Sequence, residues 1–109
     1  MQPFTNNLQG TLELLILKAL APGPNHGFGI CQHIQTVSDG LLRVEEGSLY
    51  PALHRLEKQK LLDAEWKVSD NGRRARYYRL NAAGRKALAQ AEESWEILRK
   101  GVTKVLKFA

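Results

Sequence analysis

The sequence predicts a mainly α-helical fold with one small β-hairpin and a long C-terminal helix, an α+β arrangement in 109 residues. Three observations lead to this prediction. Apolar residues recur at helical spacing in several segments, Asn71-Gly72 separates two strand-like runs, and apolar residues near the C-terminus repeat every three or four positions. A chain of this length suits one domain with a modest core, or a small domain with a protruding element.

The first helix is expected over residues 11–20, with Thr11 as its N-cap. Apolar residues lie on nearly every side of this helix, which predicts that it is buried. The segment Pro22-Gly23-Pro24-Asn25 then forces a turn.

A second helix is expected over residues 26–37. Gly27 and Gly29 weaken it, and a close approach of its backbone to a neighbouring helix or to DNA would explain both. Its buried face is expected to hold Phe28, Ile30 or Cys31, Ile34 and Val37.

The segment Leu41–Val44 is expected to form a short strand that leads into a third helix over residues 46–60. Leu49, Leu53 and Leu56 follow i, i+4, i+7 spacing and predict its buried stripe. The other side is small where the helix begins and basic further along, with Gly47, Ser48, Tyr50, Pro51, His54, Arg55 and Lys58. A helix that enters a DNA groove needs this combination, because small residues permit close approach and basic residues meet phosphates.

Each polar residue of this face has an alternative role. Ser48 is a candidate for a phosphate contact or only for a helix cap, and Tyr50 for a phosphate contact or for packing under the hairpin. His54 and Arg55 are candidates for base contacts or for solvated positions with a salt bridge.

Residues 62–69 and 76–80 are expected to be the two strands of the hairpin. In the first, Ala64, Trp66 and Val68 alternate with charged residues. Asn71-Gly72 is a strong hairpin signal because both residues tolerate positive φ. Arg73, Arg74 and Arg76 near the tip have little structural need there, so we expect them to contact phosphate or the minor groove.

The basic charge is concentrated around this hairpin. Residues 67–86 hold seven basic residues and one acidic one, a net charge of +6 against +5 for the whole chain. Such clustering indicates an anionic partner, nucleic acid or a membrane surface, and the alternative is a solvated basic face.

The last helix is expected to start after the N-cap Asn81 and to continue to Lys107. Its heptad seam holds Leu88, Ala91, Trp95, Leu98, Val102 and Val105. Such a helix is about 40 Å long, too long to cover one side of so small a domain. We therefore expect a second copy to pack on the seam, and the alternative is that the seam folds back on the first helix. This divides the chain into residues 1–81 and a dimerisation helix over residues 82–109.

Other classes of protein find little support in the sequence. The single cysteine, Cys31, excludes an intramolecular disulfide and a cysteine-based zinc site, and it suits a core position better than a redox sensor. The three histidines lack metal-ligand spacing, and no nucleophile–histidine–carboxylate set or phosphate-cradling loop is present, so we expect no metal, no cofactor and no enzyme activity. The absence of a signal peptide and of a spanning segment predicts a cytoplasmic protein without membrane contact.

Two motifs resemble a known family. Glu46-Gly47-Ser48-Leu49-Tyr50-Pro51-Ala52-Leu53-His54-Arg55-Leu56-Glu57 is similar to the signature helix of PadR-like transcriptional regulators, and Gly72-Arg73-Arg74-Ala75-Arg76-Tyr77-Tyr78-Arg79-Leu80 is similar to that family's wing. His26-Gly27-Phe28-Gly29-Ile30 resembles its N-terminal portion.

The resemblance implies a winged helix-turn-helix that forms a homodimer through its last helix and represses nearby genes from a roughly palindromic operator in double-stranded DNA. The single C-terminal helix is similar to the small subclass of the family. In multidrug-sensing members of that subclass a tryptophan after Glu-Ser stacks with its mate around planar drugs, and Glu93-Ser94-Trp95 aligns with it. Trp95 is therefore a candidate contact for a small planar aromatic effector, or it fills the dimer core. The alternative function is a winged-helix module that binds an acidic protein instead of DNA.

Overall fold

The computed structural model describes residues 7–68 and 70–108. Within them the elements follow in the order α1 (Asn7–Ala19), β1 (Asn25–His26), α2 (Gly27–Val37), α3 (Glu46–Lys58), β2 (Leu62–Val68), β3 (Arg74–Leu80) and α4 (Ala82–Lys107). The predicted fold class, mainly α with a β-hairpin, is confirmed. The sequence did not predict the two-residue strand β1, which makes the sheet three-stranded in the order β1-β3-β2.

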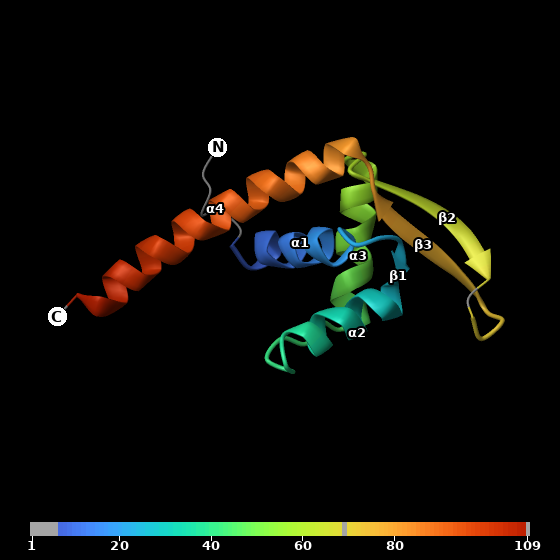
Figure 1. The fold of residues 1–109 in the computed structure, drawn as a ribbon, viewed down its shortest axis with the longest axis horizontal. Helices are drawn as coiled ribbons and strands as arrows, with labels where there is room; N and C mark the ends of the chain where they lie inside the picture. Colours follow the sequence, from blue (N-terminus) through green and yellow to red (C-terminus); the bar gives the residue numbers. More distant parts are fainter. Residues whose placement is uncertain (1–6, 69, 109) are drawn as a thin grey trace.

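The helices form a body from which two elements project (Figure 1). The first half of α4 lies along α1, and α3 runs from the start of α4 to α2, while the β2–β3 hairpin and the C-terminal half of α4 extend at opposite ends. The chain therefore measures 57 × 29 × 23 Å along its principal axes.

One cluster of buried apolar side chains joins all four helices to the base of the sheet. The predicted stripe of α3 is confirmed, since Leu49, Leu53 and Leu56 are each at most 1% exposed. Burial of one such side chain contributes about 1.5–3 kcal/mol relative to exposure. The cluster consists of Ile16, Leu17, Ala19, Leu20, Ile30, Ile34, Leu49, Ala52, Leu53, Leu56, Leu62, Tyr78, Leu80 and Leu88.

Two predictions about the first half of the chain were wrong. The helix α1 begins at Asn7, so Thr11 lies inside it and is not its N-cap. The segment Leu41–Val44 forms no strand. Its backbone bonds return to the end of α2 instead, where the Leu42 N–H donates to Ser38 Oγ at 3.0 Å. The amides of this segment are therefore not arranged to pair with the sheet.

The buried face of α2 is narrower than predicted. Ile30 and Ile34 are buried as expected, and Cys31 is half-buried, but Phe28 is 58% and Val37 64% exposed. Phe28 precedes Ile30 by two positions and so lies on the opposite side of the helix. Val37 is the last helical residue.

The hairpin is paired from Leu62↔Leu80 at its base to Val68↔Arg74 at its tip. Gly72, near the tip, has φ +82°, and β3 begins two residues earlier than expected. The predicted end of the first strand, Ser69, lies outside the described residues. Trp66 is 59% exposed because this part of the hairpin extends beyond the body.

The start of α4 is anchored on the base of the hairpin. Asn81 caps the helix as predicted, because its Oδ1 accepts the N–H of Gly84 at 2.8 Å. Its Nδ2 donates to the carbonyl oxygen of Lys60 at 2.9 Å. Lys60 itself has φ +63°, and α3 ends before it, at Lys58 rather than at the predicted residue 60. A Cβ on Gly84 would collide with the carbonyl oxygen of Leu61, so glycine is required for this close approach.

Candidate nucleic-acid interface

The outer face of α3 is exposed along its whole length. Ser48, Tyr50, His54 and Lys58 all present exposed side chains, and the small residues Gly47 and Pro51 leave the beginning of this face low. A low, polar face on one exposed helix is the shape that fits a DNA major groove.

The N-terminus of α3 is less suited to phosphate than the sequence suggested. Glu45 and Glu46 are both exposed there, and their carboxylates repel a phosphate placed at the helix start. The N–H groups of Ser48 and Leu49 already donate to the carbonyl oxygen of Glu45 at 3.0 Å. Contacts to phosphate are therefore left to side chains further along the helix.

Tyr50 joins α3 to the start of α2. Its phenol lies directly over Gly27, so close that a Cβ on Gly27 would be 2.5 Å from the Tyr50 hydroxyl oxygen. Of the two explanations that the sequence offered for Gly27, approach to another helix is the one observed. Burial, followed by the nearby carboxylate of Glu46, raises the pKa of Tyr50 above its usual value. The hydroxyl thus keeps its proton at neutral pH and can donate to a phosphate oxygen.

Two predicted DNA-binding arginines are held by carboxylates from elsewhere in the chain. Arg55 Nε lies 3.3 Å from Glu13 Oε2 on α1. Arg76 Nη2 lies 2.5 Å from Glu57 Oε2 on α3. Both pairs are partly buried, and together they connect α1, α3 and the hairpin. This geometry favours a bracing role for these arginines over contact with DNA.

Arg73 and Arg74 are exposed at the end of the hairpin, where the sequence placed them. The guanidinium carbon of Arg74 lies 5.1 Å from the centre of the Trp66 ring. Arg79 lies nearer the base and pairs with Asp63 at 3.2 Å. The ion pair of Arg79 is therefore nearer the base of the hairpin than the contact of Arg74 with Trp66.

An open groove of about 930 Å³ separates the hairpin from the beginnings of α2 and α3. We call it the interface groove. One wall includes Gly27, Phe28, Gln32 and Tyr50, and the other includes Trp66, Arg73, Arg74 and Arg76. Its lining holds aromatic rings and three arginines against the one carboxylate of Asp70. This excess of positive charge suits a sugar–phosphate backbone, since apolar side chains pack on sugars and arginines meet phosphates. Phe28 and Trp66 were not predicted as site residues, because their spacing suggested inward positions.

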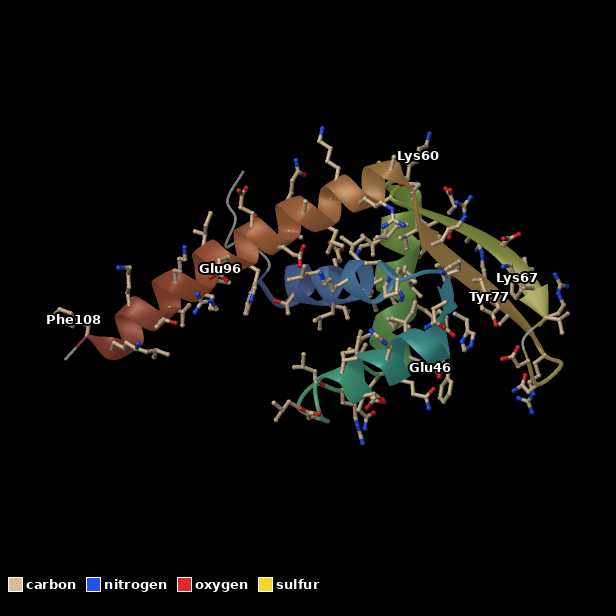
Figure 2. The ribbon with its side chains drawn as sticks, viewed as in Figure 1. Glu46, Lys60, Lys67, Tyr77, Glu96 and Phe108 are labelled. Atoms are coloured by element: carbon tan, nitrogen blue, oxygen red, sulfur yellow. The ribbon has the colours of Figure 1, made fainter. Side chains whose placement is uncertain are left out.

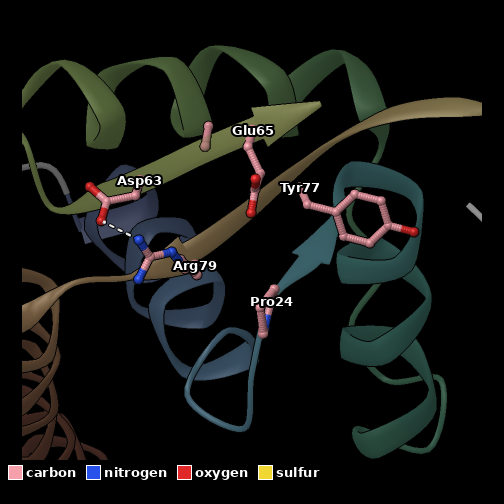
Figure 3. Close-up of a pocket in the computed structure, with 6 residues that line it drawn as sticks. Pro24, Asp63, Glu65, Tyr77 and Arg79 are labelled. Carbon is pink, nitrogen blue, oxygen red and sulfur yellow. Dashed lines mark ion pairs between the residues drawn. The ribbon is translucent and has the colours of Figure 1, made fainter. Parts of the chain in front are cut away.

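A second, smaller pocket lies on the opposite face of the hairpin (Figure 3). It has a volume of about 160 Å³ and is lined by Pro24, Asp63, Ala64, Glu65, Tyr77 and Arg79. The ion pair between Arg79 and Asp63 crosses it. With two carboxylates and one paired arginine, this pocket does not suit a phosphate.

The predicted seam of α4 divides into a covered and an open half. Leu88 is only 8% exposed and belongs to the core, and Lys18 on α1 pairs with Glu92 at 3.1 Å. Ala91 and Leu98 are half-buried, and Trp95 is 42% exposed. Exposure then rises toward the C-terminus, which Figure 2 shows projecting beyond the body with Phe108 at its end. The open half holds Val102, Val105 and Leu106, which are 47%, 74% and 79% exposed.

Leu106 was not among the predicted seam residues. It lies eleven positions after Trp95, three turns of the helix, and therefore on the same side.

The described residues contain no group of three or more His, Cys, Asp or Glu side chains placed to hold a metal ion. Within the same residues, no helix combines the length and the apolar character needed to cross a bilayer.

Comparison with known proteins agrees with this geometry. Residues 16–90 match the transcriptional regulator PadR-like family. The chain is 38% identical over 94 residues to the Mycobacterium tuberculosis transcriptional regulator Rv3488, which covers 86% of this chain and 84% of that protein.

Solved structures extend the similarity to nearly the whole chain. A transcriptional regulator from Clostridium thermocellum is 30% identical with a TM-score of 0.83, covering 94% of this chain and 97% of that one. A PadR-like transcriptional regulator from Bacillus cereus is 28% identical with a TM-score of 0.77, covering 96% of this chain and 100% of that one.

Proposed function

The chain belongs to the PadR-like family of transcriptional regulators, and on this premise we propose that it is a homodimeric repressor that binds a roughly palindromic operator. The observation that carries the proposal is the exposed, low face of α3 beside the arginine-bearing tip of the hairpin. In this arrangement α3 enters the major groove and the hairpin, the wing, follows the adjacent backbone.

The contacts divide between sequence reading and positioning. His54 and Lys58 lie on the exposed face of α3 and reach base edges or the phosphates beside them. Tyr50, Arg73 and Arg74 bind phosphate. Arg55 pairs with Glu13 and Arg76 pairs with Glu57, and these two ion pairs fix the positions of α1, α3 and the wing relative to one another.

The open half of α4 supports dimerisation. Val102, Val105 and Leu106 form an apolar stripe that the chain itself leaves exposed. A second copy that covers this stripe would place two recognition helices on one duplex, and a two-fold symmetric dimer matches a palindromic site.

Trp95 is proposed as the contact of a small planar effector that releases the operator. Its indole is 42% exposed at the border between the covered and the open half of α4. There it can face its symmetry mate and stack on a flat aromatic molecule.

A binding titration with DNA tests the central claim. The duplex upstream of the chain's own gene, labelled with fluorescein, is compared with a scrambled duplex of the same composition at several salt concentrations. We expect preference for the upstream duplex and a slope of log K against log salt near −0.9 per phosphate contacted. Arg73→Ala and Arg74→Ala should each reduce that slope by about one per protomer, and so by about two for the dimer. Equal affinity for both duplexes at every salt concentration would sink the proposal.

Sedimentation tests the dimer. Val102→Asp places a charge in the open stripe and should convert the dimer to a monomer. Lys104→Asp is the matched control, because Lys104 lies two positions after Val102 and therefore on the opposite side of α4. The same dimer mass for wild type and Val102→Asp would contradict the assignment of the interface.

Tryptophan fluorescence tests the effector contact. The chain has two tryptophans, so Trp95→Leu leaves Trp66 as an internal control. Planar cationic dyes should quench the wild type more strongly than Trp95→Leu. Equal quenching of the two proteins would argue against a site at Trp95.

A further inference from the structure

The register of the wing places Trp66 among arginines. Trp66 is paired with Arg76, and Val68 with Arg74, so all four side chains belong to one face of the wing. Further along this face Tyr78 is buried in the core, and Arg76 reaches α3. This is therefore the face that turns toward α3 and lines the interface groove.

Arg76 is already engaged on this face. Its Nη2 contacts Glu57, and its guanidinium lies 5.8 Å from the centre of the Tyr78 ring. To reach a phosphate it would have to leave Glu57, and the carboxylate would then face the DNA uncompensated. Repulsion between that carboxylate and the phosphates opposes such a movement.

Arg74 is held in a different way. It is exposed, and its guanidinium lies over the Trp66 ring at 5.1 Å. No carboxylate lies within ion-pair distance of it among residues 7–68 and 70–108. The Trp66 ring thus orients the guanidinium, and no carboxylate of the described residues pairs with its charge.

We propose that Trp66 is a positioning residue that holds the Arg74 guanidinium ready for a phosphate on the floor of the interface groove. The proposal deepens the DNA-binding function stated above and rests on it. A ring against one face of the planar guanidinium leaves its N–H groups free to point outward in the plane, where they can donate to phosphate oxygens. The stacked side chain also has fewer rotamers to lose when the DNA binds.

The opposite face of the wing provides a matched control. There Lys67 Nζ lies 5.5 Å from the centre of the Tyr77 ring (Figure 2). This is the same kind of cation–aromatic contact, but Lys67 is not among the residues that line the interface groove, and its Nζ also lies 3.8 Å from Glu65 Oε1. Lys67→Ala should therefore change DNA affinity much less than Arg74→Ala.

A double-mutant cycle on DNA affinity tests the coupling. Wild type, Trp66→Leu, Arg74→Ala and the double variant are titrated with the upstream duplex, after thermal unfolding has shown that each is folded. We expect Trp66→Leu to weaken binding by about two- to fivefold, the range of a cation–aromatic contact, and to have almost no further effect when Arg74 is already alanine. Arg74→Ala should lower the salt slope by about one per protomer, whereas Trp66→Leu should leave it unchanged because the charge remains.

Independent effects of the two substitutions would overturn the proposal, since Trp66 would then act on wing stability or on DNA directly. If Trp66→Leu does not fold, Arg74→Lys tests the same point in the intact wing. Lysine keeps the charge but not the planar stack, so binding should weaken while the salt slope stays constant. An affinity of Arg74→Lys equal to that of the wild type would also overturn it.

A direct optical signal comes from the tryptophan itself. In Trp95→Phe, Trp66 is the single tryptophan, and DNA that draws Arg74 onto a phosphate beside it should change its emission. Unchanged emission at saturating DNA contradicts the placement of Trp66 in the interface groove. If the wild type shows no affinity for the upstream duplex at all, the proposed function fails; if it binds and the cycle is additive, only this inference fails.

Discussion

Gly27→Ala is the most informative single substitution in the interface groove. The new methyl group would lie 2.5 Å from Oη, 2.7 Å from Cζ and 2.8 Å from Cε1 of Tyr50. These atoms are the far end of a flexible side chain that is 46% exposed, so the ring can move aside. The substitution therefore displaces Tyr50 without forcing the backbone apart.

The expected effects on stability and on DNA binding differ in size. Moving the ring off its preferred rotamer costs about 0.5–1.5 kcal/mol. Replacing glycine by alanine lowers the conformational entropy of the unfolded chain and so stabilises the fold by about 0.4–1 kcal/mol. The two effects oppose each other, so the free energy of unfolding should change by less than about 1 kcal/mol. A displaced Tyr50 hydroxyl loses its hydrogen bond to an anionic phosphate, a loss of about 1.5–3 kcal/mol. DNA affinity should consequently fall about 10- to 100-fold.

The assay combines thermal unfolding with fluorescence anisotropy on the upstream duplex. Gly10→Ala is the control, because a Cβ at this exposed position of α1 would meet nothing within 4 Å. Its DNA affinity should equal that of the wild type. Gly27→Ala is then repeated in a Tyr50→Ala background, where the methyl group has room and should have no further effect. If it weakens binding equally in that background, Gly27 approaches the DNA itself and the reasoning about Tyr50 is wrong.

Three other predictions concern the scaffold of the site. Gly84→Ala pushes a methyl group against the carbonyl oxygen of Leu61, which is backbone and cannot swing aside. Urea denaturation should therefore show that the free energy of unfolding falls by about 1–3 kcal/mol, and an unchanged midpoint contradicts this close packing. His26→Ala removes the Nδ1 acceptor that caps α2 at 3.0 Å and should cost about 0.5–2 kcal/mol in the same assay, part of which His26→Asn restores; equal losses in both variants would exclude a capping role. Burial, followed by two carboxylates at the start of α3, raises the pKa of the Cys31 thiol, so at neutral pH iodoacetamide should modify it more slowly than free cysteine, and faster modification contradicts a protonated thiol.

Short-range patterns predicted the parts of the fold that depend on neighbours in sequence. The α3 stripe follows from leucines at i, i+4 and i+7, and the α4 start follows from the Asn81 side chain reaching the N–H three residues on. Both features are complete within a few turns of one helix. They therefore required no knowledge of what packs against them.

The ion pairs of the site could not be predicted in this way. Glu13 and Arg55 lie 42 positions apart, and Glu57 and Arg76 lie 19 apart. Nothing in the local sequence distinguishes an arginine that finds a carboxylate from one that stays available to DNA. Arg74 and Arg76 lie two residues apart on the same strand face, yet only Arg76 reaches α3, because it lies one pleat nearer the body.

The apolar repeat of α4 shows the same limit in a different form. An apolar repeat every three or four residues indicates that one side of a helix is covered, but it does not indicate which element covers it. The sequence allowed two answers, a second copy or the first helix of the same chain. In the structure the two halves of the helix differ: Leu88 is in the core and 8% exposed, while Val105 is 74% exposed. The cover of the first half includes α1, which has 13 residues against the 26 of α4. The length of α1, and not the pattern of α4, therefore decides how much apolar surface is left for a partner.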